Sequence, residues 1–78
     1  MDKTGNDDHF EKFLAVVGKR IKEIRESKGL TQAEMSQEPF PFERRYWQRI
    51  EAGEVNITLK TLYLIAEKLD VAINDIFK

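Results

Sequence analysis

The chain contains no cysteine, and in only 78 residues this leaves few ways to stabilise a fold. Domains of this size usually depend on disulfides, on a bound metal ion, or on very regular packing of helices. Disulfides and cysteine-ligated zinc are excluded, and the single histidine, His9, is too few for a histidine-based metal site. We therefore expect one small domain, stabilised by helix packing, with no metal ion and no cofactor.

The composition also favours a helical domain. Hydrophobic residues make up 41% of the chain and charged residues 35%, with only four glycines and two prolines. These proportions favour a soluble all-α protein over a disordered chain, a collagen or a β-sandwich. No window approaches about 18 uninterrupted apolar residues, and no apolar signal segment follows the polar residues 1–8. We expect a cytoplasmic protein with no membrane partner.

Apolar residues recur with helical spacing between residues 9 and 28. At about 100° per residue they fall in an arc of roughly 100°, which is typical of an amphipathic helix. They are Phe10, Phe13, Leu14, Val17, Ile21 and Ile24. Gly29 follows at the place of a C-terminal glycine. Residues 1–8 are expected to be a flexible lead, with Asp7 or Asp8 as the helix cap.

Local signals mark the ends of the later helices. Thr31 and Glu34 have the spacing of a capping box, and Pro39 stops the helix that begins there. Thr58 is the expected cap of the fourth helix, and Asp70 is expected to take a left-handed conformation at its end. The expected core of that helix is Leu59, Leu62, Ile65, Ala66 and Leu69. The five expected helices span residues 9–28, 31–38, 43–51, 59–69 and 73–77, and no strand is expected.

The third expected helix has two contrasting faces. Tyr46, Trp47 and Ile50 share one arc of roughly 100°. The opposite arc, about 140° wide, carries Arg44, Arg45, Gln48 and Arg49 and no acidic residue. A guanidinium group can donate two hydrogen bonds to guanine, and a glutamine amide can read adenine. We expect Trp47 to fill the core and the arginine face to contact DNA; the alternative is an ordinary solvated face.

The charge distribution is compatible with an anionic partner although the net charge is −1. Residues 19–49 contain eight basic and five acidic side chains, and the rest of the chain contains five basic and nine acidic ones. One region of the molecule is therefore basic. Two short helices joined by a tight turn suggest a helix-turn-helix, in which the first helix crosses the DNA backbone and the second enters the major groove.

Residues 18–77 resemble the lambda-repressor/Cro-like helix-turn-helix family of bacterial and phage regulators. The segments that carry the resemblance are GKRIKEIR (18–25), KGLTQAE (28–34), YWQRIEAG (46–53), NITLKTL (56–62), IA (65–66), LDV (69–71) and IF (76–77). They occur in the family's order over about three quarters of the chain. The resemblance implies a compact five-helix lambda-repressor-like DNA-binding domain, here with an extended first helix.

The resemblance also implies roles for single residues. Arg25 and Glu51 match a pair that forms a partly buried salt bridge between the first helix and the end of the third. The hydroxyl of Tyr46 could reach a phosphate while its ring packs. The residues expected to read bases are Arg44, Arg45, Gln48 and Arg49, and those expected to contact phosphates are Gln32, Tyr46, Asn56 and Lys60.

The turn before the third helix departs from the family pattern. It is one residue longer than usual, and it carries Pro39-Phe-Pro-Phe42 where the family normally has a glycine. Glu43 stands where a Ser or Thr cap is common in the family. We expect these changes to alter the docking angle of the third helix without abolishing binding.

A module of this size buries too little DNA surface for strong selectivity as a monomer, so we expect a homodimer on a palindromic site. The expected interface is the last helix with the outer side of the fourth, and its residues are Leu64, Ile73, Ile76 and Phe77. The alternative is that all of these except Leu64 close the core. The long first helix is a second candidate interface, because Phe10, Phe13 and Leu14 extend beyond the usual start of the family.

The predicted function is a sequence-specific DNA-binding transcriptional regulator, such as a repressor of phage or plasmid origin or a restriction-modification controller. No catalytic residues are expected, because the chain has no nucleophile–base pair and no phosphate-binding loop. No small-molecule ligand is expected either. The alternative is an antitoxin or another protein-interaction module built on the same fold.

Overall fold

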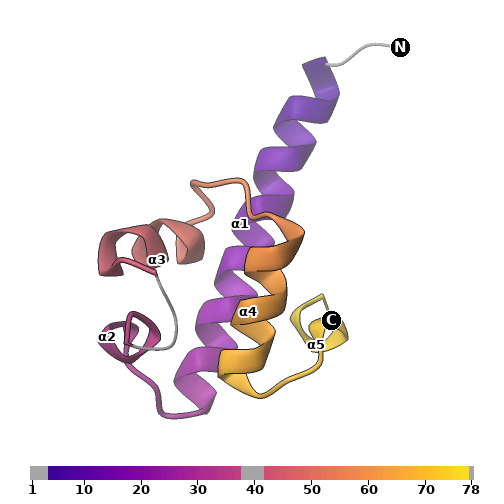
Figure 1. The fold of residues 1–78 in the computed structure, drawn as a ribbon. Coiled ribbons are helices and arrows are strands. Elements are labelled where there is room, and N and C mark those ends of the chain that lie inside the picture. The colour runs from indigo at the N-terminus through magenta and orange to yellow at the C-terminus, as the bar shows by residue number, and fades with distance from the viewer. Residues whose placement is uncertain (1–3, 38–41, 78) are drawn as a thin grey trace.

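The computed structural model describes residues 4–37 and 42–77. Within these ranges the chain is all-helical, with five helices and no strand (Figure 1). The helices are α1 (Thr4–Ser27), α2 (Gln32–Met35), α3 (Arg44–Glu51), α4 (Leu59–Leu69) and α5 (Ile73–Ile76). None of these helices has the length and apolar character needed to cross a membrane.

Helix α1 begins at Thr4, inside the segment that the sequence predicted to be a flexible lead. Asp7 and Asp8 therefore lie within the helix rather than at its cap. Once a helix has nucleated, each added residue gains a backbone hydrogen bond, and no proline stops its extension toward the N-terminus. At 24 residues α1 is ~36 Å long, and its N-terminal part projects beyond the other helices (Figure 1).

Helix α2 has the predicted capping box but ends earlier than predicted. The Glu34 N–H donates to Thr31 Oγ1 at 3.2 Å, and the Thr31 N–H donates to Glu34 Oε1 at 2.7 Å. The helix ends at Met35 rather than at residue 38 because the next two N–H groups, of Ser36 and Gln37, bond to carbonyls three residues back, a tighter turn. Most of the long turn, residues 38–41, lies outside the described residues.

The later helices differ from prediction by one residue or not at all. Helix α3 begins at Arg44, with Glu43 in the cap position and no side-chain cap bond. Helix α4 has the predicted bounds; Thr58 Oγ1 accepts from the Thr61 N–H at 3.1 Å, and Asp70 has a φ of 57°. Helix α5 ends one residue before Phe77.

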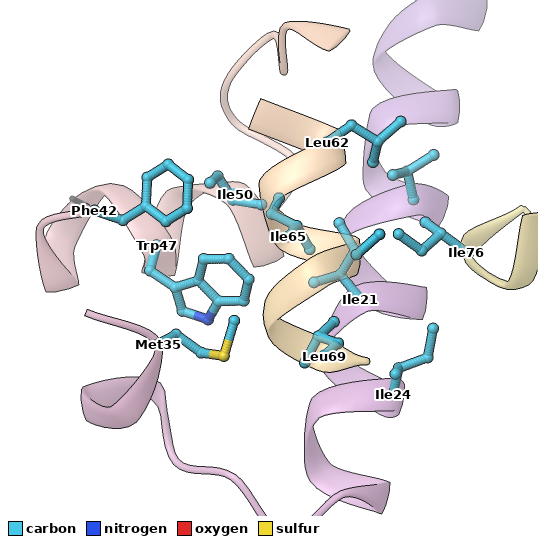
Figure 2. Close-up of a cluster of buried hydrophobic side chains, with 12 residues drawn as sticks. Ile21, Ile24, Met35, Phe42, Trp47, Ile50, Leu62, Ile65, Leu69 and Ile76 are labelled. Carbon is cyan, nitrogen blue, oxygen red and sulfur yellow. The ribbon is translucent and has the colours of Figure 1, made fainter. Parts of the chain in front are cut away.

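The core gathers around Trp47, which is fully buried (Figure 2). Met35 and Phe42 lie on either side of its indole in this view, and Ile21, Ile65 and Leu69 fill the space between α1 and α4. The buried hydrophobic residues are Val17, Ile21, Ile24, Met35, Phe42, Trp47, Ile50, Leu62, Ile65, Ala66, Leu69 and Ile76.

One of the predicted core positions, Leu59, is wrong. Leu59 is 77% exposed, because it stands in the first turn of α4 at the edge of the apolar arc. Phe10 and Phe13, which belong to the second candidate interface, are exposed, because α1 projects beyond the elements that cover Val17. Leu64, which lies outside the predicted apolar arc of α4, is half-buried and packs against the core. The side of α4 that contacts the core is therefore wider than that arc.

Helix α1 separates α3 from α5. A Cβ on Gly18 would lie 2.5 Å from the Ile50 carbonyl oxygen, so α3 packs directly on this glycine. Arg20 Nε donates to the Asp75 carbonyl oxygen at 3.0 Å and joins α1 to α5. Residues 18 and 20 are about 200° apart around a helix, so α3 and α5 pack on opposite faces of α1 (Figure 1).

Candidate nucleic-acid interface

Helix α3 divides its side chains as its sequence pattern predicted. Trp47, Ile50 and Glu51 are buried. The exposed side chains are Arg44, Arg45, Gln48 and Arg49, and we call them the arginine face. The only acidic residue of α3 is Glu51, which points inward, so no residue of the helix itself neutralises this face.

The guanidinium groups of the arginine face are only weakly engaged. Arg49 Nε lies 3.8 Å from Glu54 Oε1, and both side chains are more than half exposed. Such a long, solvated pair contributes little energy and is easily exchanged for another anion. In the described part of the chain neither Arg44 nor Arg45 forms an ion pair. An open hollow lies beside this face, lined by Arg45, Gln48, Arg49, Ala52 and Glu54.

A buried carboxylate, that of Glu51, holds α3 against α1 and α2. Arg25 and Glu51 form the ion pair that the resemblance implies, with Nε 2.5 Å from Oε2 and Nη2 3.2 Å from Oε1. Their side chains are 7% and 4% exposed. A buried ion pair of this kind orients the elements it joins more than it adds net stability. Arg25 Nη1 also donates to the Leu30 carbonyl oxygen at 2.7 Å.

Two further donors reach Glu51, and sequence reasoning missed both. Trp47 Nε1 donates to Oε2 at 2.6 Å, and Gln32 Nε2 donates to Oε1 at 3.0 Å. The first could have been found from spacing, because residues four apart on a helix are neighbours and a buried indole N–H needs an acceptor. The second joins residues 19 positions apart and depends on the packing of α2 on α3.

The residues predicted to contact phosphates have different surroundings. Gln32 is half-buried, and its amide oxygen accepts from Gln48 Nε2 at 3.4 Å, so both ends of its amide are engaged within the protein. Tyr46 is half-buried, with its ring centroid 5.9 Å from that of Phe42. Asn56, between α3 and α4, and Lys60, in the first turn of α4, are exposed.

The structure removes part of the predicted dimer interface. Ile76 is 1% exposed and belongs to the core, so it cannot contact a second chain. Leu64 and Ile73 are half-buried and pack against the core. The core needs these residues because α5 closes one end of it between α1 and α4. Of the four, only Phe77 is exposed, at 48%.

An exposed aromatic surface lies next to the predicted one. The rings of Phe13 and Phe77 are stacked, with centroids 6.1 Å apart and planes 3° from parallel. Together with Phe10 they line an apolar groove, whose other walls include Ile57 and Leu62. We call Phe10, Phe13 and Phe77 the phenylalanine surface. It combines residues of α1, the second candidate interface, with Phe77, the last residue of the interface predicted from the fourth and fifth helices.

No group of three or more acidic or histidine side chains suited to a metal ion occurs in residues 4–37 and 42–77. Glu34 and Tyr63, which have shifted pKa values, lie away from the arginine face. Hydrogen bonds from the backbone and side chain of Thr31 lower the pKa of Glu34, and a hydrogen bond to Glu67 raises that of Tyr63. Comparison of the chain with models of known protein families and with curated protein sequences gave no match.

Proposed function

We propose that this protein is a sequence-specific DNA-binding transcriptional regulator that places α3 in the major groove. The observation that carries the proposal is the arginine face: three arginines and a glutamine, all exposed, on a helix whose one carboxylate is turned inward. The resemblance to lambda-repressor/Cro-like regulators supports it. In this proposal the fold is lambda-repressor-like, and α2 and α3 form its helix-turn-helix.

The dimensions and chemistry of α3 suit the major groove. An α-helix with its side chains is about 10–12 Å in diameter, close to the groove width of about 12 Å. Guanidinium groups can donate two hydrogen bonds to guanine or neutralise the phosphates on the groove walls. An acidic side chain on this face would be repelled by those phosphates, and α3 exposes none.

The Glu51 hydrogen bonds support the proposal because they hold α3 rigidly. The carboxylate is bonded to a residue of α1, Arg25, and to a residue of α2, Gln32. A surface that is ordered before binding loses less conformational entropy when its ligand arrives. The protein therefore presents the arginine face in one orientation.

We further propose that the active species is a homodimer formed through the phenylalanine surface. Because α3 and α5 pack on opposite faces of α1, a second copy bound beside α5 leaves both arginine faces free. A twofold pair would then read two half-sites of a palindromic operator. The phenylalanine surface replaces Leu64, Ile73 and Ile76, which the core uses.

The proposal is tested by selecting duplexes from a random pool with the purified protein. We expect one enriched motif, and we expect Arg44→Ala and Arg49→Ala each to cost about 1–3 kcal/mol of affinity for it. Lys22→Ala is the matched control, because it removes an exposed cation from α1 and lowers the net charge equally. Binding should also fall steeply with salt as phosphate contacts are screened.

Two results would contradict the proposal. One is a pool in which no sequence is enriched, which would favour a protein-interaction module. The other is an equal loss of affinity in the arginine variants and in Lys22→Ala, which would mean that the protein binds DNA only through its overall charge.

A further inference from the structure

Around Glu51, the chemistry of the neighbouring side chains fixes which group donates and which group accepts each hydrogen bond. Its carboxylate faces four N–H donors: two from Arg25, one from Trp47 and one from Gln32. Neither a guanidinium nor an indole N–H can accept a hydrogen bond. Arg25 donates to both carboxylate oxygens and Trp47 donates to Oε2, so the group at Oε2 in particular must be an acceptor.

The next side chain in this series of hydrogen bonds is Gln32, whose amide has one donor end and one acceptor end. If its oxygen faced Glu51, two acceptors would meet in a partly buried site at considerable cost. Its Nε2 faces Glu51 instead, at 3.0 Å, which turns the oxygen toward Gln48, three residues before Glu51 on α3. There the oxygen accepts from Gln48 Nε2 at 3.4 Å.

Gln48 is exposed and ends this chain of hydrogen bonds. One hydrogen of its Nε2 is used by Gln32, so its second hydrogen and its oxygen remain for a ligand. This donor and acceptor match N7 and the N6 amino group of adenine in the major groove. Guanine presents two acceptors there, N7 and O6, and O6 would face the Gln48 oxygen.

We infer that Glu51 is a positioning residue for base recognition: through Gln32 it sets the direction of the Gln48 amide and thereby favours adenine over guanine at one operator position. The inference rests on the proposed function. It assigns to Glu51 a role in specificity beyond that of holding α1 against α3.

Glu51→Gln provides the decisive variant. A carboxamide at position 51 has one donor end, and that end cannot take the place of Oε2, where Arg25 Nε and Trp47 Nε1 both donate. It takes the place of Oε1 instead, at the cost of the 3.2 Å bond from Arg25 Nη2. It must face Gln32, whose amide then reverses and presents its Nε2 to the oxygen of Gln48. Gln48 is left with two N–H groups, which match the two acceptors of guanine.

The experiment is a random-pool selection with the wild-type chain, followed by affinity measurements on the adenine and guanine forms of the selected duplex. For the wild type we expect an adenine preference of roughly tenfold, the size of one good bidentate contact. For Glu51→Gln we expect the preference to reverse. Trp47→Phe removes one donor and keeps the carboxylate, so it should destabilise the fold and retain the adenine preference.

Gln32→Met keeps the test decisive if Glu51→Gln does not fold. It interrupts the chain of hydrogen bonds at a half-buried surface position and leaves Gln48 free to rotate, so the preference should be lost without reversal. An unchanged adenine preference in Gln32→Met, or in folded Glu51→Gln, would overturn the inference. So would a wild-type motif whose bases are insensitive to Gln48→Ala.

Failure of the proposed function is a separate result. If the wild type enriches no motif, the proposed function as a regulator is wrong, and the proposed role of Glu51 in base recognition is wrong with it. The amide direction is then decided in the free protein by NMR. We expect one Gln32 amide proton to be shifted downfield by Glu51 and to lose that shift in Glu51→Gln, and an unshifted proton in the wild type would overturn the amide arrangement itself.

Discussion

Trp47 donates its indole N–H to the Glu51 carboxylate at 2.6 Å, across one turn of α3 and in the centre of the protein. The two side chains link the apolar core to the arginine face, because the same carboxylate binds Arg25 and Gln32. The largest core residue thus has a polar role that its volume alone does not indicate.

Removing this one hydrogen bond should destabilise the fold. Trp47→Phe keeps an aromatic ring in the core but leaves Glu51 with one donor fewer, and we expect a loss of about 2–4 kcal/mol in unfolding free energy from the lost bond and the smaller ring. Urea unfolding followed by circular dichroism measures the loss. Tyr46→Phe, at the neighbouring half-buried position, is the control and should change little. Equal stability of the two variants would show that the indole N–H contributes nothing.

The close approach of α1 and α3 at Gly18 gives a second prediction. An alanine Cβ there would lie 2.5 Å from the Ile50 carbonyl oxygen and 2.7 Å from that of Glu51. Both contacts are with backbone, so α3 must move, and we expect Gly18→Ala to cost about 1–3 kcal/mol of stability and to weaken DNA binding.

Gly29→Ala is the matched control for Gly18→Ala. Gly29 has a φ of +73° and no neighbour within 4 Å of an added Cβ, so this variant pays about 1–2 kcal/mol of backbone strain without displacing α3. Thermal unfolding and duplex affinity distinguish the two. If both lose stability and both keep full affinity, the position of α3 does not depend on Gly18.

These features differ in how far the sequence could predict them. The bounds of α4 were predicted correctly because Thr58 and Asp70 act on their own backbone, so their signals are local. The two faces of α3 were predicted for a similar reason: a period of 3.6 residues separates Trp47 from the arginines whatever the helix packs against.

Burial depends on the neighbouring elements, and there the sequence was less informative. Phe10 and Val17 share one apolar arc, but only Val17 is buried by neighbouring elements, because α1 extends beyond the elements that pack on it. Ile76 was assigned to an interface because the depth of α5 in the core cannot be read from four residues. The Gln32–Glu51 bond joins two helices whose relative position no local signal specifies.

The phenylalanine surface predicts the oligomeric state. Phe13→Ser removes one of two stacked, exposed rings, and we expect the mass measured by analytical ultracentrifugation to fall from two chains to one while the helical signal stays unchanged. The control is Leu59→Ser, because Leu59 is also exposed but does not line the groove. A wild type that is monomeric where it binds DNA, or a Phe13→Ser protein that stays dimeric, would rule this interface out.

The capping box of α2 predicts a pH dependence of stability. The bonds from Thr31 lower the pKa of Glu34 below its ordinary value of 4.5, so the folded protein holds the ionised form more strongly than the unfolded chain does. A carboxyl with a lowered folded pKa stabilises the fold above its unfolded pKa, and this contribution is lost as the pH falls through the folded pKa. We therefore expect Glu34→Gln to be less stable than the wild type at pH 7 and the difference to shrink below pH 4.5. Urea midpoints of both proteins, measured from pH 7 down to about pH 2, test this, and a difference that stays constant over that range would mean that the Glu34 charge does not stabilise α2.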